Sequence, residues 1–186
     1  MAKTINNLVR RWEVVGVLLI IGFGTTLHFW FEWSNYWRPI TIIAAVNEST
    51  WEHFKMAFWP SLIWGAIEYP YLRDEVVNFL PAKVLGLLTM PAVTMILFYG
   101  YTFLTGHHYL IADVAVFILS VISGQYVSYR VFTDSKKMDR KYDVLAAIVL
   151  VVMIGAFSLL SQYPPRNFLF RHPDSNEYGI LSEYDH

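Results

Sequence analysis

Five long apolar segments, separated by short polar stretches, account for most of this chain. Each has about the 17 to 25 residues that an α-helix needs to cross roughly 30 Å of hydrocarbon. The pattern therefore predicts five transmembrane helices packed in one bundle. Their apolar cores are residues 14–31, 56–72, 84–104, 109–129 and 144–160, and with flanking residues the helices are predicted near 14–31, 51–72, 84–104, 109–130 and 143–161.

Composition agrees with an all-α integral membrane protein. Apolar residues make up 55% of the chain, aromatic residues 17%, and the mean hydropathy is +0.38. A soluble domain of 186 residues with this composition would have too little polar surface. The first segment lacks the small-residue pattern of a cleavable signal peptide, so we expect it to remain in the mature protein. No long linker or repeat divides the chain, so residues 1–186 are predicted to form a single multi-pass domain in the cell membrane.

Basic residues are distributed unevenly between the two ends of the predicted helices. Ten of the 14 lysines and arginines fall at one set of ends and only four at the other. Because short cytoplasmic loops carry an excess of Lys and Arg, the N-terminus is predicted to be cytoplasmic and the C-terminus outside, with residues 163–186 as an extracytoplasmic tail. All six histidines then belong to the outer half: His28, His53, His107, His108, His172 and His186.

Charge and cysteine content exclude some classes of function. The formal net charge of −1 gives no indication of nucleic-acid binding. The chain has no cysteine, so disulfides and thiolate metal sites are excluded. Membrane lipids are the partners that the composition predicts.

Two connections between helices are informative. Residues 105–108 join the third and fourth helices, which must be antiparallel neighbours with His107 and His108 at the mouth of the hairpin. Residues 40–46 are mostly apolar and follow Pro39, but they are too short to span. We expect them to lie at the outer interface or to dip in and return as a re-entrant segment, where they could form a lid.

Polar residues concentrate in segment 47–55, Asn-Glu-Ser-Thr-Trp-Glu-His-Phe-Lys. The apolar span that follows is short, so these charges are expected at or just below the headgroup level, where they need partners. Ser49 and Glu52 have the spacing of a capping box, in which the serine caps the free amides of the helix start and the glutamate reaches back. This structural interpretation leaves Glu48, His53 and Lys55 without an explanation.

Helical spacing places the unexplained residues on two neighbouring polar faces. Glu48, Glu52 and Lys55 fall on one face, while Ser49 and His53 share a stripe roughly 100° away. A single histidine at an interface is commonly a hydrogen-bonded anchor, so these two faces alone do not establish a site.

Two other helices bring ionisable residues to a similar depth. Asp113 lies about one turn inside the fourth helix, in an otherwise apolar run, and such a residue is by default a functional-site hypothesis. His28 lies near the outer end of the first helix, and Glu32 shares its face if the helix continues that far. Three helices thus contribute histidines and carboxylates to one shallow layer.

Histidine nitrogens and carboxylate oxygens are the ligands that zinc and other divalent ions take in proteins. We therefore expect a divalent metal site, with zinc the favoured ion, although an ion-pair network that holds the helices together remains an alternative. His172 and His186, in the tail, are expected to be solvated. The predicted metal ligands are His28, His53, His107 and His108, the predicted catalytic carboxylates are Glu48 and Asp113, and the residues expected to cap the helix or orient the ligands are Glu32, Asn47, Ser49, Trp51, Glu52 and Lys55.

Outside this layer, polar residues have structural interpretations. Glu68, near the inner end of the second predicted helix, is expected to pair with Arg73 or Lys83. Gln125 and Arg130, near the inner end of the fourth, are expected to be interface groups rather than a second site.

The chain resembles a known family in its motif and its ending. Val46 to Lys55, followed by Phe58-Trp59-Pro60 and Glu68-Tyr69, resembles the signature of a family of small prokaryotic multi-pass membrane proteins catalogued as a domain of unknown function. The ending is similar as well, with Pro164-Pro165, Leu169-Phe170, Asp174 and Tyr178-Gly179-Ile180. The resemblance covers nearly the whole chain and implies a polytopic membrane protein without an assigned activity. At Ala45 the chain departs from the pattern, which usually has a proline there.

A fainter resemblance is to the membrane hydrolase superfamily of alkaline ceramidases and progestin and adipoQ receptors. In the receptors an Asn-Glu-Thr run precedes a Trp and a His, and intramembrane histidines hold zinc. Asn47, Glu48, Ser49, Trp51 and His53 are similar in order, but the Trp and His arrive two residues early. This chain also has five predicted helices instead of seven and no His-x-x-x-His.

The sequence therefore predicts a polar, metal-binding pocket that opens toward the outer leaflet. If the site is catalytic, a lipid or amphiphile that arrives laterally from the bilayer is the expected substrate of a metal-dependent hydrolase. A proton-coupled transporter or small-molecule-binding protein is the alternative, although polar residues thin out toward the middle of the helices. A structural or assembly factor, in which the polar cluster only holds helices together, is the third possibility.

Overall fold

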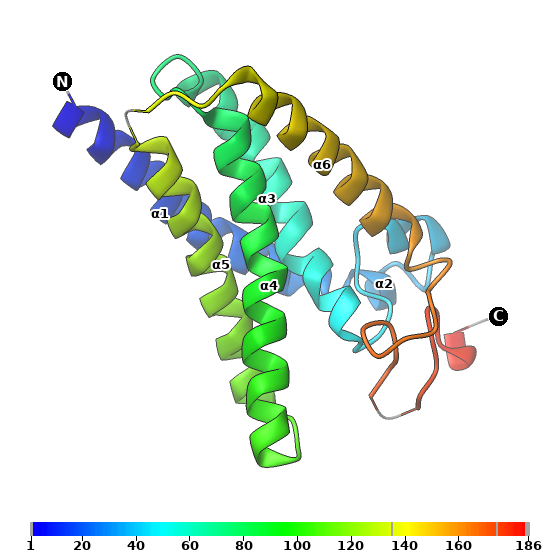
Figure 1. Ribbon diagram of the computed structural model, residues 1–186. Helices are drawn as coiled ribbons and strands as arrows, with labels where there is room; N and C mark the ends of the chain where they lie inside the picture. Colours follow the sequence, from blue (N-terminus) through cyan, green and yellow to red (C-terminus); the bar gives the residue numbers. More distant parts are fainter. Residues whose placement is uncertain (1, 135, 174, 185–186) are drawn as a thin grey trace.

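Helices make up almost all of the regular structure of the chain. A computed structural model describes residues 2–134, 136–173 and 175–184. These residues contain no named strand, and only one isolated bridge joins Arg171 and Tyr178. The helices are α1 (Ala2–Leu27), α2 (Trp30–Trp33), α3 (Thr50–Leu72), α4 (Phe79–Thr105), α5 (Leu110–Phe132) and α6 (Arg140–Leu159), with two short 3-10 helices, η1 (Arg38–Ile42) and η2 (Ser182–Tyr184) (Figure 1).

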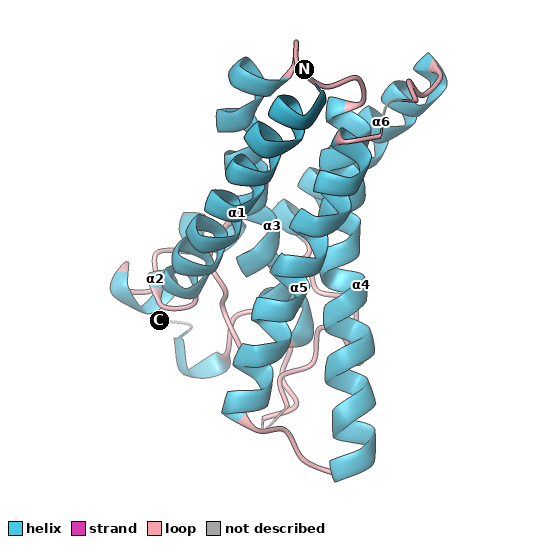
Figure 2. Ribbon diagram, turned by 90° about the vertical axis from the view of Figure 1, so that its left-hand side faces the viewer, coloured by secondary structure: helices cyan, strands magenta, loops and turns pink. Residues whose placement is uncertain are grey.

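An antiparallel hairpin of α4 and α5 is the most extensive helix pair of the fold (Figures 1 and 2). Gly106 ends α4 in the left-handed conformation, with φ of 74°, which reverses the chain at little steric cost. The two backbones nearly touch at Gly86 and Gly124, where a Cβ on either glycine would lie 2.8 Å from the carbonyl oxygen of the other. This arrangement confirms the predicted antiparallel neighbours.

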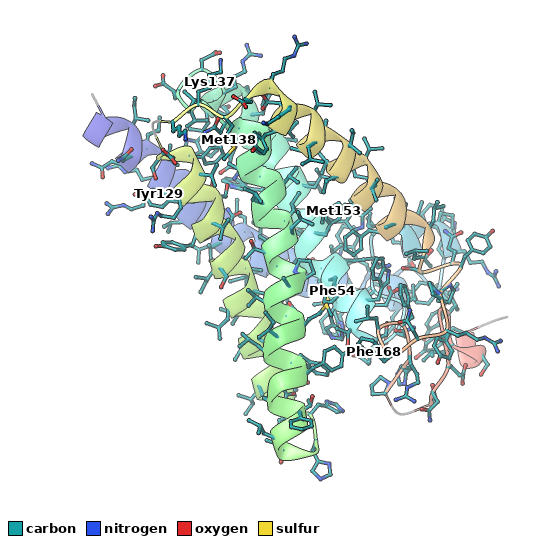
Figure 3. All side chains as sticks on the ribbon, in the orientation of Figure 1. Phe54, Tyr129, Lys137, Met138, Met153 and Phe168 are labelled. Carbon is teal, nitrogen blue, oxygen red and sulfur yellow. The ribbon has the colours of Figure 1, made fainter. Side chains whose placement is uncertain are left out.

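The remaining long helices pack around this hairpin. Helix α1 contacts α3 and α5, and α4 contacts α3 and α6. A buried cluster at the junction of three helices contains Phe54 of α3, Leu87 of α4 and Met153 of α6. Figure 3 labels two of them, Phe54 and Met153. The apolar faces of α3 and α6 are therefore buried against α4, and α6 leads the chain back to the end of the bundle where α3 begins.

The outer surface of the bundle is apolar. Ile96, Phe103, Ile111 and Val151 are 69 to 88% exposed, and so continuous an apolar exterior is typical of a protein that is solvated by lipid. Helices α4, α5 and α6 are each long and apolar enough to cross a membrane. The protein is thus all-helical with three such helices, and α1 and α3 fall outside this set among the described residues.

The first helix differs most from its predicted bounds. It begins at Ala2 rather than near residue 14 and ends at Leu27, so that His28 follows the helix. Glu32 lies in the separate short helix α2 and does not continue the face of α1 as expected. The predicted bounds of the other four helices differ by about five residues or fewer, because caps and polar end turns extend beyond the apolar cores.

The segment after α2 packs inward instead of forming a separate span. Ala44, Ala45 and Val46 are at most 5% exposed and pack against residues that include Leu27 and Phe31. The backbone amide of Ala45 donates to the carbonyl oxygen of Leu27. This segment is therefore part of the wall that supports the end of α1, and η1 lies just before it.

Candidate metal centre

Three side chains from separate parts of the chain converge beside the start of α3. His28 follows the last residue of α1, His53 lies in the first turn of α3, and Glu48 lies in the loop just before that helix. One possible ligand atom from each residue can be chosen so that all three atoms lie within 4.8 Å of one another. The structure thus joins two of the four predicted histidine ligands with one of the two predicted catalytic carboxylates.

The close packing of α1 and α3 brings the two histidines together. Gly24, one turn before His28, lies so close to α3 that a Cβ there would be 2.3 Å from the carbonyl oxygen of Met56. The two imidazole centroids are 5.7 Å apart. A small residue at this position lets the backbones approach, as is common where membrane helices cross.

The orientation of His53 is fixed by its own helix. Its Nδ1 lies 2.9 Å from the carbonyl oxygen of Ser49, and a carbonyl oxygen can only accept, so Nδ1 carries the proton. The other ring nitrogen, Nε2, faces Glu48 at 3.6 Å from Oε2. A ring held by Nδ1–H on a backbone carbonyl, with Nε2 free to bind, is the arrangement found around metal-ligating histidines.

Glu48 lies between the two imidazoles. Its Oε1 is 3.2 Å from His28 Nε2, while its Oε2 faces His53. In a neutral His53 the Nε2 lone pair would face a carboxylate oxygen, and two acceptors attract only if a cation lies between them. That cation is either a proton on the ring or a bound metal ion. Ligands of a tetrahedral zinc are about 3.3 Å apart, given Zn–N and Zn–O bonds of about 2.0 to 2.1 Å, which is close to both separations.

Electrostatics at Glu48 favour the ionised carboxylate. The hydrogen bond from His28 lowers the pKa of Glu48 below its usual value, and the charges of His28, His53 and His172 act in the same direction against the opposing effect of burial. The Glu48 side chain is 50% exposed, so solvent screens part of these interactions. Glu48 is therefore a negatively charged group that is reachable from outside the protein.

Two of the three residues, His28 and Glu48, line a pocket of about 300 Å³. The segment 45–48, the residues just after α1 and helix α2 form one wall, and the C-terminal tail forms the other. Asn47 links the two walls, because its Nδ2 donates to the carbonyl oxygen of Gly179 at 2.7 Å and its Oδ1 accepts from the amide of Ser49 at 2.7 Å. Glu48 thus lies between Asn47 and Ser49, whose hydrogen bonds fix the backbone on both sides of it. The tail residues that line the pocket are His172, Ser175, Glu177, Leu181, Ser182 and Tyr184.

The predicted capping box does not form. Ser49 is the N-cap residue of α3, but its side chain makes no capping hydrogen bond. Glu52 reaches back past the helix start and accepts from the amide of Val46 at 3.1 Å. The amide of Ser49 is bound by Asn47 instead, so the loop is closed by an asparagine turn rather than by a serine cap.

Glu52 and Lys55 form a buried ion pair away from the pocket. Both residues are at most 1% exposed, and Lys55 Nζ lies 2.7 Å from Glu52 Oε2. Lys55 Nζ also donates to the carbonyl oxygen of Thr41 at 2.7 Å and to Ser161 Oγ at 2.8 Å, and Ser161 donates to Glu52 at 2.7 Å. This network connects η1, α3 and the end of α6, so these two charges of the motif have a structural role.

Trp51, which also lies in α3, holds the C-terminal tail in place. Its ring stacks on Phe157 of α6 and on Phe170 of the tail, with centroid distances of 4.7 and 4.6 Å. Its amide donates to the carbonyl oxygen of Leu169 at 2.9 Å. Trp51 thus supports the pocket indirectly, by holding the tail that forms one wall.

The other predicted ligands and the second predicted catalytic carboxylate lie at the tip of the α4–α5 hairpin, whereas Glu32 of α2 lines the pocket. Asp113 accepts a hydrogen bond from Tyr101 and lies 3.3 Å from His108 Nδ1. His107 is exposed in the turn. Figure 1 shows this turn apart from α2 and the tail. Among the described residues, the group of three close metal-ligand side chains is His28, Glu48 and His53, without the hairpin residues.

Sequence reasoning missed the contribution of the tail. His172 was expected to be solvated but is partly buried and lines the pocket together with Glu177. The only available signal was the clustering of Ser, His and Glu after the last helix, which equally suits a solvated surface. His186 and Asp174 lie outside the described residues.

Comparison with known proteins places the chain in a family. No curated protein and no solved structure matches it. A family model does match, over residues 1–180, which is nearly the whole chain. The protein therefore belongs to DUF6512, a family of unknown function.

Proposed function

We propose that the protein binds a divalent metal ion, zinc above others, between His28, Glu48 and His53. The observation that carries this proposal is the carboxylate of Glu48 facing Nε2 of both imidazoles, at 3.2 and 3.6 Å. Two histidines and one glutamate are a ligand set of catalytic zinc sites, which keep a fourth position open. The faint resemblance to the ceramidase and receptor superfamily points to the same chemistry.

We further propose that the site hydrolyses a lipid or another amphiphile. Zinc with an open position lowers the pKa of bound water toward neutrality. Glu48 is occupied as a ligand, so the general base must be another carboxylate, and Glu32 lies on the wall of the same pocket. The apolar wall residues Phe29, Phe31 and Leu181 suit an acyl chain or other apolar group beside the polar site.

The proposed setting is a five-span bundle with the N-terminus in the cytoplasm. Helices of 26 and 23 residues, as α1 and α3 are, measure about 39 and 35 Å, enough to cross a bilayer. Their charged residues Glu13, Glu52, Lys55 and Glu68 are buried in the bundle, whereas Leu18 of α1 is 69% exposed. These buried charges do not meet lipid, so they do not oppose a membrane-spanning position of α1 and α3.

Metal content tests the proposal directly. Elemental mass spectrometry of the detergent-purified full chain, prepared without a metal-binding tag, should find about one equivalent of zinc after incubation with the ion and desalting. His28→Ala and His53→Ala should each lose it, because two remaining ligands bind zinc far more weakly. His107→Ala is the matched control and should retain the metal, since His107 lies in the hairpin turn. Folded wild-type protein that holds no metal would contradict the proposal.

The affinity for zinc should depend steeply on pH. Both imidazoles must be deprotonated to bind zinc, and the hydrogen bond to Glu48 raises the pKa of His28 above its usual value, so the affinity should fall by more than about tenfold between about pH 7.5 and about pH 5.5. The pKa of Glu48 is lowered, so this carboxylate stays ionised over that range and adds no further loss. Isothermal titration at several pH values measures the slope, and a pH-independent affinity would argue against histidine ligands.

A further inference from the structure

A second polar cluster lies at the opposite end of the bundle, where four helices meet. Lys83 of α4 forms ion pairs with Glu13 of α1, at 2.8 Å from Oε1, and with Glu68 of α3. Helix α5 adds Ser128, whose hydroxyl donates to Glu13 Oε1 at 3.0 Å. Lys83 was among the expected partners of Glu68, but Glu13 lay outside the predicted first helix and was not considered.

The charges in this cluster do not balance. Glu13, Glu68 and Lys83 are 4, 0 and 8% exposed, so two carboxylates share one ammonium group out of contact with water. Glu13 Oε2 and Glu68 Oε1 are both buried without a hydrogen-bond partner among the described residues. An uncompensated charge in such a place costs several kcal/mol, and buried acids neutralise by taking up a proton.

We propose that this cluster binds one exchangeable proton, shared between Glu13 and Glu68. Two carboxylates that repel each other in a low dielectric hold a proton between them, whereas one carboxylate beside one ammonium is balanced. The titratable groups of the cluster are Glu13 from α1, Glu68 from α3 and Lys83 from α4, and the α5 side chains that face them, Gln125 and Ser128, are neutral. With one proton bound, the cluster has no net charge.

This inference is independent of the metal centre. The pocket beside the metal centre does not include the cluster, and a proton needs no cavity to occupy. Buried carboxylates that exchange protons are the elements from which membrane proteins build proton relays. The protein would then have a proton-binding site at the end of the bundle that is predicted to face the cytoplasm, far along α1 and α3 from His28 and His53.

Infrared spectroscopy of the reconstituted full chain tests this inference. At neutral pH the wild type should show the carbonyl stretching band of a protonated carboxylic acid, shifted in heavy water. Glu13→Gln and Glu68→Gln should each lose the band completely, because the remaining carboxylate is then balanced by Lys83 and ionises. Glu75→Gln, at an exposed position in the turn after α3, is the matched control and should keep it.

Two results would overturn the inference. A wild-type spectrum without the band would mean that both carboxylates are ionised. A band that persists in Glu13→Gln and disappears only in Glu68→Gln would mean that Glu68 is protonated by its own burial, with no proton shared. Glutamine is close in shape to a protonated glutamate, so the variants should fold, and circular dichroism and a cooperative unfolding transition verify that they do.

Discussion

Replacing Lys55 by methionine should lower the free energy of unfolding by about 3–5 kcal/mol, the usual consequence of removing one partner of a buried ion pair. Methionine removes the ammonium group that contacts Glu52, Thr41 and Ser161. The carboxylate of Glu52, only 1% exposed, is then left in the protein interior without the ammonium group, and either a bare charge or the uptake of a proton costs free energy. Unfolding of the purified full chain, followed by circular dichroism in detergent, measures the change.

Two further variants show whether the buried charge is the cause. Lys141→Met makes the same substitution in an exposed ion pair, because the side chains of Lys141 and Asp139 are 69% and 74% exposed. It should change the free energy of unfolding by less than about 1 kcal/mol. Adding Glu52→Gln to Lys55→Met removes the orphaned charge and should recover part of the loss. Equal stabilities of Lys55→Met and Lys141→Met would contradict this account of the motif.

Adding a single methyl group at Gly24 should both destabilise the protein and weaken its metal binding. The Cβ of Gly24→Ala would lie 2.3 Å from the backbone oxygen of Met56, so α1 and α3 must separate. Overpacking of this kind typically costs about 1–3 kcal/mol. The same separation moves His28 away from His53, and zinc affinity should fall at least about tenfold, as it does when the support of a ligand is lost.

Gly22 provides the control on the same helix. A Cβ there meets nothing within 4 Å, so Gly22→Ala should be neutral or stabilising by up to about 1 kcal/mol, because alanine favours the helix more than glycine does. Thermal unfolding and zinc titration of both variants separate a steric effect from a general effect of alanine. Equal behaviour of the two variants would show that α1 and α3 do not approach as closely as inferred.

Helix positions followed from the sequence because apolar runs mark the segments that must avoid water. The runs at 84–104 and 109–129 correspond to α4 and α5, and the short connection between them required the antiparallel hairpin. The N-terminal half of α1 was not predicted, because Arg10, Arg11 and Glu13 interrupt the apolar pattern. Backbone hydrogen bonds extend a helix through charged residues, but a helix predicted from apolar residues alone ends where the charged residues begin.

The sequence placed histidines and carboxylates at one depth, but which of them meet depends on contacts between distant residues. The structure brings together His28, Glu48 and His53. Depth alone could not distinguish them from Asp113 and His108, which lie at the hairpin tip, because depth does not specify which helices are adjacent. The capping box failed for a similar reason, since Glu52 interacts with Lys55 and Ser161 more closely than with its own helix start.

The hydrogen bond from Asn47 to Gly179 joins residues 132 positions apart in the sequence. During translation His28, Glu48 and His53 are synthesised long before the C-terminal tail. Membrane helices form as they leave the ribosome. The wall that the tail residues from His172 to Tyr184 named above contribute can therefore form only after the helices have been inserted. The pocket beside the proposed metal centre is therefore complete only after translation has ended, and an ion captured earlier would bind at a site that still lacks this wall.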